Sequence, residues 1–198
     1  DVYKRQEQIL LNQVDPETER DLIKGDFNNF GFEARLLSNY EVFGKKSTFL
    51  IGSKFYKADN TSVQGPGSTG SDPNFEFQLD DYPNYQNQSA YDYPNLNVAI
   101  FGENIFYLND KLSITPGFRF EHIKTESDGF FKRINTDGAG NVILNEMVDN
   151  SETRERSFVL FGLGASYKPS DALEIYGNVS QNYRSVTFTD ISLSLIHI

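Results

Sequence analysis

The strongest constraint on the fold is a period-two alternation of apolar with polar or small residues that recurs along the chain. It is clear in residues 28–39, 112–123, 158–168 and 173–184, and weaker in 47–58 and 95–108. Side chains of successive strand residues point to opposite faces, so this pattern predicts strands with two unlike faces. No segment has a convincing helical period, since Gly and strand-forming residues stand where a helix needs Ala, Leu or Glu. The sequence therefore predicts an all-β protein.

The connections between these segments are of two kinds. Short ones are predicted at 41–46, 108–111 and 168–172, and long polar ones at 15–27, 59–94 and 125–156. Short and long connections alternate, which is typical of an outer-membrane barrel with short turns on one side and long loops on the other. Each predicted strand has about 11 to 13 residues, which at a tilt near 45° spans roughly 25–30 Å. We therefore expect an antiparallel transmembrane β-barrel fragment of about six or seven long strands.

The composition excludes several classes of function. The chain has 18 Lys and Arg against 28 Asp and Glu, for a formal net charge of −10. Nucleic-acid binding requires a basic face, which this balance does not favour. The absence of cysteine excludes a disulfide scaffold, a thiolate metal site and a cysteine nucleophile.

The two terminal hexapeptides resemble translated sequencing adapter. Residues 1–6 read DVYKRQ and residues 193–198 read LSLIHI. GATGTGTATAAGAGACAG encodes the first, and its reverse complement encodes the second; the string looks like a transposon end used in library construction. Such segments are excluded from fold reasoning. We therefore expect residues 7–192 to be an internal piece of a longer barrel protein.

Four runs resemble the TonB-dependent outer-membrane receptors. They are NVAIFGEN at 97–104, LSITPGFRFE at 112–121, NVSQNYRSVTF at 178–188 and FGFEARL at 30–36, the last similar to the ferric-citrate branch. The resemblance implies a piece of a barrel of about 22 strands with a plugged lumen in the bacterial cell outer membrane. It also implies import of a ferric chelate, either ferric citrate or a siderophore, with energy supplied by the TonB complex through an N-terminal plug. The partners would be outer-membrane lipid, TonB and the chelate.

Tyrosines in the long segment 59–94 are candidate ligand contacts. Tyr82, Tyr85 and Tyr91 lie among Asn, Gln, Asp and Pro. Tyrosine offers a rigid surface and a hydroxyl at low entropic cost, which suits ligand recognition. The alternative is that these side chains pack within the loop and against its neighbours.

Arginines in or near the long loops are candidate contacts for an anionic chelate. Arg154, Arg156 and Arg184 are selected, with Arg133 nearby, and Arg184 is favoured because its parity places it on the lumen face. Guanidinium groups bind carboxylates bidentately and stay charged. The interpretation that the residues favour is that these arginines pair with the many loop carboxylates, for example Arg154 and Arg156 with Glu152 and Glu155.

Charged residues on the expected lumen face are predicted to form a structural network. Glu33 and Arg35 lie on one segment, and Arg119 and Glu121 on another. We expect these four side chains to form a wall against which a plug rests.

Several other interpretations stay open or are disfavoured. Aromatic and amide side chains also suit a carbohydrate or cobalamin cargo, and a soluble β-sandwich adhesin or binding module would show shorter strands. An outer-membrane hydrolase needs a histidine-based constellation, and outside the last hexapeptide His122 is the only histidine. We expect no enzyme activity, no catalytic residue, no cofactor and no resident metal; residues 135–141 favour a hairpin turn over a calcium loop.

Overall fold

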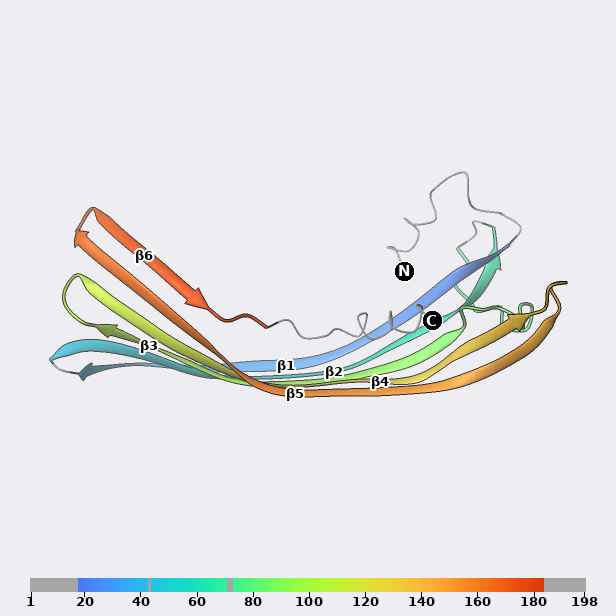
Figure 1. The fold of residues 1–198 in the computed structure, drawn as a ribbon, viewed down its shortest axis with the longest axis horizontal. Coiled ribbons are helices and arrows are strands. Elements are labelled where there is room, and N and C mark those ends of the chain that lie inside the picture. Colours follow the sequence, from blue (N-terminus) through green and yellow to red (C-terminus); the bar gives the residue numbers. More distant parts are fainter. Residues whose placement is uncertain (1–17, 43, 71–72, 184–198) are drawn as a thin grey trace. The chain divides into compact units, whose positions relative to one another are not determined.

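The computed structural model describes residues 18–42, 44–70 and 73–183. Six strands follow one another in this part of the chain: β1 (Glu19–Val42), β2 (Lys45–Thr69), β3 (Ser89–Tyr107), β4 (Leu112–Thr136), β5 (Val142–Ser170) and β6 (Leu173–Ser180). They form one antiparallel sheet in chain order, so each strand lies beside the next one along the sequence (Figure 1). The predicted all-β antiparallel fold is confirmed.

The strands are much longer than the sequence pattern predicted. β1 has 24 residues, β2 and β4 have 25 each, and β5 has 29. The prediction of long loops at 15–27 and 125–156 is wrong for the described residues, because residues 19–27 belong to β1 and most of 125–156 belongs to β4 and β5. Backbone ladder bonds can continue where both faces of a sheet meet water, and there the apolar alternation that marks a strand is lost.

The connections follow the prediction more closely. β3 and β4 are joined by residues 108–111, and β5 and β6 by residues 171–172. Residues 137–141 form the tight turn of the β4–β5 hairpin, which confirms the preferred interpretation of that segment. The connection at 70–88 between β2 and β3 is the long one within the described residues, and it is shorter than the predicted 59–94.

The described part of the chain divides into two compact units. The loop unit comprises the described residues 18–28, 58–70, 73–94 and 126–153, and the turn unit comprises the described residues 29–42, 44–57, 95–125 and 154–183. The loop unit holds the β2–β3 connection and the β4–β5 turn. The turn unit holds the β3–β4 and β5–β6 turns and the paired stretch in which Gly162 faces Ser180.

Large apolar side chains of the turn unit lie on its surface. Phe30, Phe32 and Phe161 are 65%, 56% and 61% exposed, while residues with little exposure include the small Ala99 and Ser47. Phe32 stacks on Phe55 of the neighbouring strand with ring centroids 5.7 Å apart. Much of the large apolar surface of the turn unit is therefore exposed. Among the described residues, no helix is long and apolar enough to cross a membrane.

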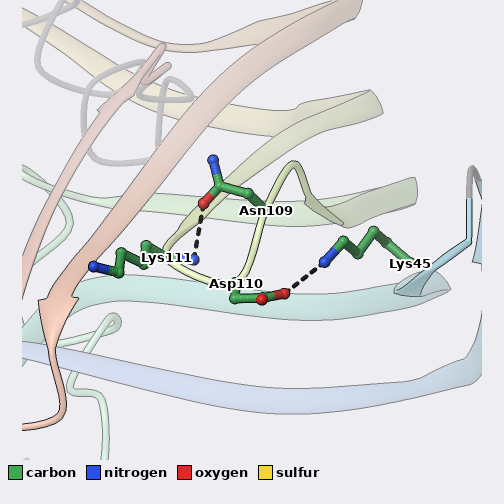
Figure 2. A network of polar contacts seen from close by, with 4 residues as sticks. All are labelled: Lys45, Asn109, Asp110 and Lys111. Carbon is green, nitrogen blue, oxygen red and sulfur yellow. Dashed lines mark hydrogen bonds and ion pairs between the residues drawn. The ribbon is translucent and has the colours of Figure 1, made fainter.

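A polar contact joins two turn regions of the turn unit. The Lys45 ammonium group, at the start of β2, lies 2.5 Å from a carboxylate oxygen of Asp110 in the β3–β4 turn (Figure 2). Asn109 closes the same turn, because its side-chain oxygen accepts a hydrogen bond from the Lys111 amide at 2.8 Å. These contacts fix the short turn that the Asn-Asp pair predicted.

Candidate functional site

Residues 73–88, here called the anchored loop, are bound to β1 through Tyr85. The Tyr85 hydroxyl donates to a carboxylate oxygen of Asp21 at 2.6 Å. The side-chain amide of Gln64, on β2, donates to both oxygens of the same carboxylate at 2.8 and 2.9 Å. Tyr85 is 8% exposed. Burial first, and then the hydrogen bond to Asp21, raise the pKa of Tyr85 above its usual value, so the phenol is neutral at physiological pH.

The same loop is held from β4 and β5. The Lys132 ammonium group, on β4, donates to the Pro83 carbonyl oxygen at 2.5 Å and to the Gln88 side-chain oxygen at 3.3 Å. The side-chain amide of Asn145, on β5, donates to the Pro83 carbonyl oxygen at 3.2 Å and to the Asn84 side-chain oxygen at 2.8 Å. Side chains from β1, β4 and β5 therefore converge on one short segment of the loop unit.

The other predicted tyrosines differ in accessibility. Tyr82 is partly exposed in the anchored loop, and its amide donates to the Gln78 carbonyl at 3.2 Å. Tyr91, on β3, is 8% exposed and stacks on Tyr93 with centroids 5.9 Å apart. Tyr82 thus has the most accessible ring of the three predicted ligand contacts, and the contacts themselves stay a prediction.

Arg156 in the turn unit bonds to a neutral group. It is exposed on β5, and its guanidinium donates a hydrogen bond to the Tyr183 hydroxyl, while the Tyr183 ring packs on Phe158 at 4.2 Å between centroids. Within the described residues no carboxylate contacts Arg156, so the predicted pairing with Glu155 is not found there. Arg154 is also exposed and has a contact of its own. Arg184 lies outside the described residues.

His122 stands between two polar side chains of β5. Its Nδ1 lies 2.9 Å from the Ser157 hydroxyl, and its Nε2 lies 3.9 Å from a carboxylate oxygen of Glu155. His122 lies on β4, and Ser157 and Glu155 lie on β5.

The predicted charge network takes the form of two local ion pairs around an aromatic ring. Arg35 pairs with Glu33 at 2.5 Å, and Arg119 pairs with Glu121. The two guanidinium carbons lie 5.7 and 5.4 Å from the centroid of Phe101, on β3. Each arginine thus pairs with the glutamate two residues away on its own strand. The role of these side chains as a wall for a plug stays a prediction, and Phe101, which lies near both guanidinium groups, was not predicted.

Gly52 makes room for this arrangement. A Cβ added at Gly52 would lie 2.5 Å from the Phe101 ring, so the ring lies over the backbone of β2. Arg35 on β1 and Arg119 on β4 can then reach one ring from both sides. The sequence gives no local signal for this contact, because Gly52 and Phe101 are distant along the chain.

The arrangement suits recognition by hydrogen bonds and charge. Exposed guanidinium and phenol groups can bind an anion, and the anchored loop offers amide and phenol groups. Among the residues that the structure describes, no group of three or more His, Asp or Glu side chains is placed to hold a metal ion. Long antiparallel strands on which apolar side chains alternate with polar ones are typical of membrane β-barrels.

Comparison with known protein families shows to which family the chain belongs. A family model described as TonB dependent receptor-like, beta-barrel, matches residues 4–194, and this chain therefore belongs to that family. Its members are transporters of the bacterial outer membrane that work with TonB, and they are not enzymes. No curated protein matches the chain.

Proposed function

We propose that this chain is part of a receptor that captures an anionic ferric chelate, either ferric citrate or a siderophore, and imports it with TonB-supplied energy. The family supports outer-membrane, TonB-dependent transport. The nature of the cargo is our inference from the side chains. In this proposal loops and lumen bind the chelate, and no bond in it is made or broken.

The observation that carries the proposal is the surroundings of Arg156. Its guanidinium is exposed and, within the described residues, bonds to a phenol, so its positive charge is not neutralised there. Arg154 lies two residues away on the same face of the strand, but it has a contact of its own, so the cationic site of this proposal is Arg156 alone. An anionic cargo needs such a local cationic site because the chain as a whole has a net charge of −10. Guanidinium groups recognise carboxylates in a bidentate geometry.

The test is ferric citrate binding to the purified full-length receptor. Arg156→Gln removes the charge and keeps a polar side chain, and we expect its Kd to rise roughly ten- to hundredfold, the range for a lost charged hydrogen bond. Lys168→Gln is the matched control, because Lys168 is exposed on the same strand and pairs with Glu174 at 3.3 Å. Equal affinity of wild type and Arg156→Gln would contradict the role of Arg156.

The same assay separates the cargo classes. A linear oligosaccharide and cobalamin are offered in place of ferric citrate. The ferric-chelate proposal would be overturned if the wild-type receptor bound one of these two cargoes and not ferric citrate, and if Arg156→Gln bound that cargo with the same affinity. The neutral cargo would then be favoured. It would leave the family assignment intact.

We also propose that residues 1–6 and 193–198 derive from sequencing adapter and that residues 7–192 are the receptor sequence. The support is the match of both hexapeptides to the two strands of one DNA string. Sequencing the gene in its source DNA tests this. Other residues are expected at both ends, and recovery of the same hexapeptides in the genome would contradict it.

A further inference from the structure

The anchored loop, which connects β2 and β3, contacts strands on both sides of the β2–β3 pair. Its side-chain contacts reach β1 through Tyr85 and reach β4 and β5 through Pro83, Asn84 and Gln88. A loop held by only one neighbouring strand could swing away about that contact. Contacts on opposite sides oppose such a movement.

Backbone and ring contacts add to this attachment. The Gln78 amide donates to the Pro66 carbonyl, on β2, at 2.8 Å. The Phe77 ring lies so close to Gly65 that an added Cβ would be 2.9 Å from it, and the Lys24 ammonium lies 4.6 Å from the ring centroid. The loop therefore has an ordered backbone as well as bound side chains.

Two of the contacts are strong and specific. Asp21 accepts three hydrogen bonds from Tyr85 and Gln64, and a hydrogen bond to an ionised group is stronger than one between neutral groups. Lys132 brings a full positive charge to the Pro83 carbonyl oxygen, which Asn145 also contacts. Removing either partner leaves polar groups unsatisfied, and Tyr85 is buried.

We infer that Tyr85 and Lys132 are positioning residues, which hold the anchored loop in one preformed arrangement before any cargo binds. Residues 79–82 at the loop surface, including Asp80, Asp81 and Tyr82, are then presented in fixed places. One consequence is that cargo binding requires no ordering of the loop, and this consequence alone rests on the proposed function. Preorganisation raises affinity by removing the entropic cost of ordering a segment upon binding.

The test is amide hydrogen exchange in the cargo-free, full-length receptor in detergent. The amides of Gln78, Tyr82 and Tyr85 donate hydrogen bonds within the attachment, so we expect them to be protected in the wild type. Tyr85→Phe and Lys132→Met should each speed their exchange about tenfold, as expected for the loss of one strong contact. Absence of protection in the wild type, or no change in both variants, would overturn the inference.

Controls separate positioning from a general loss of structure. Lys132→Arg retains the charge and should restore most of the protection, and Lys111→Met removes an exposed lysine from the β3–β4 turn and should change nothing in the loop. The Gly140 amide, which bonds within the β4–β5 turn, should exchange equally in all variants. Faster exchange at Gly140 together with the loop would indicate global destabilisation and would overturn the assignment.

A transport measurement tests the consequence for cargo. Lys132→Met should weaken ferric citrate binding and leave the transport rate at saturating cargo unchanged, because the loop acts on capture alone. An unchanged Kd with a lowered saturated rate would contradict this consequence. The exchange experiment needs no cargo, so failure of the ferric-chelate proposal does not change its outcome.

Discussion

The Tyr85 hydroxyl donates a hydrogen bond to Asp21 across 2.6 Å, and it joins residues that are 64 positions apart in the sequence. Asp21 lies on β1, while Tyr85 lies in the connection between β2 and β3. Through this contact the long polar connection between β2 and β3 packs against the sheet. It also makes Tyr85, which the sequence selected as a ligand contact, a buried attachment of the loop.

The alkaline titration of Tyr85 follows from this contact. Burial and the Asp21 carboxylate raise its pKa above 10.0, the ordinary value. Because the folded-state pKa is raised, the stabilisation from neutral Tyr85 is complete below pH 10.0 and is lost as the pH rises through the folded-state value. Phenolate absorbance should show a late-titrating tyrosine in the wild type that Tyr85→Phe lacks. If the two proteins instead differ by a tyrosine titrating at the ordinary value, the contact with Asp21 is contradicted.

Gly129 on β4 should tolerate no larger side chain. An added Cβ would lie 2.0 Å from the Ala90 carbonyl oxygen and 2.8 Å from the Tyr91 Cα, both of which are backbone atoms. Gly129→Ala should therefore destabilise the barrel by about 1–3 kcal/mol, the usual cost of overpacking. The measurement is thermal unfolding in detergent. Gly177→Ala is the control, because nothing lies within 4 Å of its added Cβ, and equal midpoints for the two variants would refute the close approach.

The β4–β5 turn should depend on the ionised carboxylate of Asp137. The Asn141 side chain, and then backbone amides including those of Asn141 and Ala139, lower the pKa of Asp137 below 3.8. A lowered folded-state pKa means that the stabilisation is present above pH 3.8 and is lost as the pH falls through the folded-state value. Asp137→Ala should make the turn more sensitive to proteolysis at neutral pH. Resistance equal to that of wild type would show that the side chain does not hold the turn.

The Lys45–Asp110 pair should shift a titration without changing stability measurably. The Asp110 side chain is 91% exposed, and surface ion pairs contribute little because water screens them. The hydrogen bond from Lys45 lowers the pKa of Asp110. Lys45→Ala should return that pKa toward its ordinary value, as seen in carboxyl NMR titration, and should leave the thermal midpoint unchanged. A clear fall in the midpoint would contradict the surface character of the pair.

The sequence predicted the strands well where their two faces differ. Phe30 and Phe32 alternate with Gly31 and Glu33, and this alternation lies wholly within β1. The prediction failed at residues 125–136 and 142–156, where polar and apolar side chains are mixed on both faces while the strands continue. Apolar alternation reports the contact of one face with lipid or a core, and so it marks only part of a longer strand.

The candidate site was less predictable than the fold. The types of residue were informative, since arginine and tyrosine are present and Arg156 is exposed beside the Tyr183 phenol. The residues that contact the candidate loop could not be predicted, because Asp21 and Lys132 lie far from Tyr82 and Tyr85 in the sequence and belong to no local motif. Long-range pairing depends on strand register, which a period-two pattern leaves open by multiples of two residues.

Uptake of radiolabelled ferric citrate by cells that carry the full-length receptor tests the central claim most directly. We expect uptake in cells with TonB and none above background in otherwise identical cells without it. Uptake at low ferric citrate concentration should be reduced for Arg156→Gln and normal for Lys168→Gln. Equal uptake with and without TonB would contradict energised transport, and no uptake in either cell would contradict ferric citrate as the cargo.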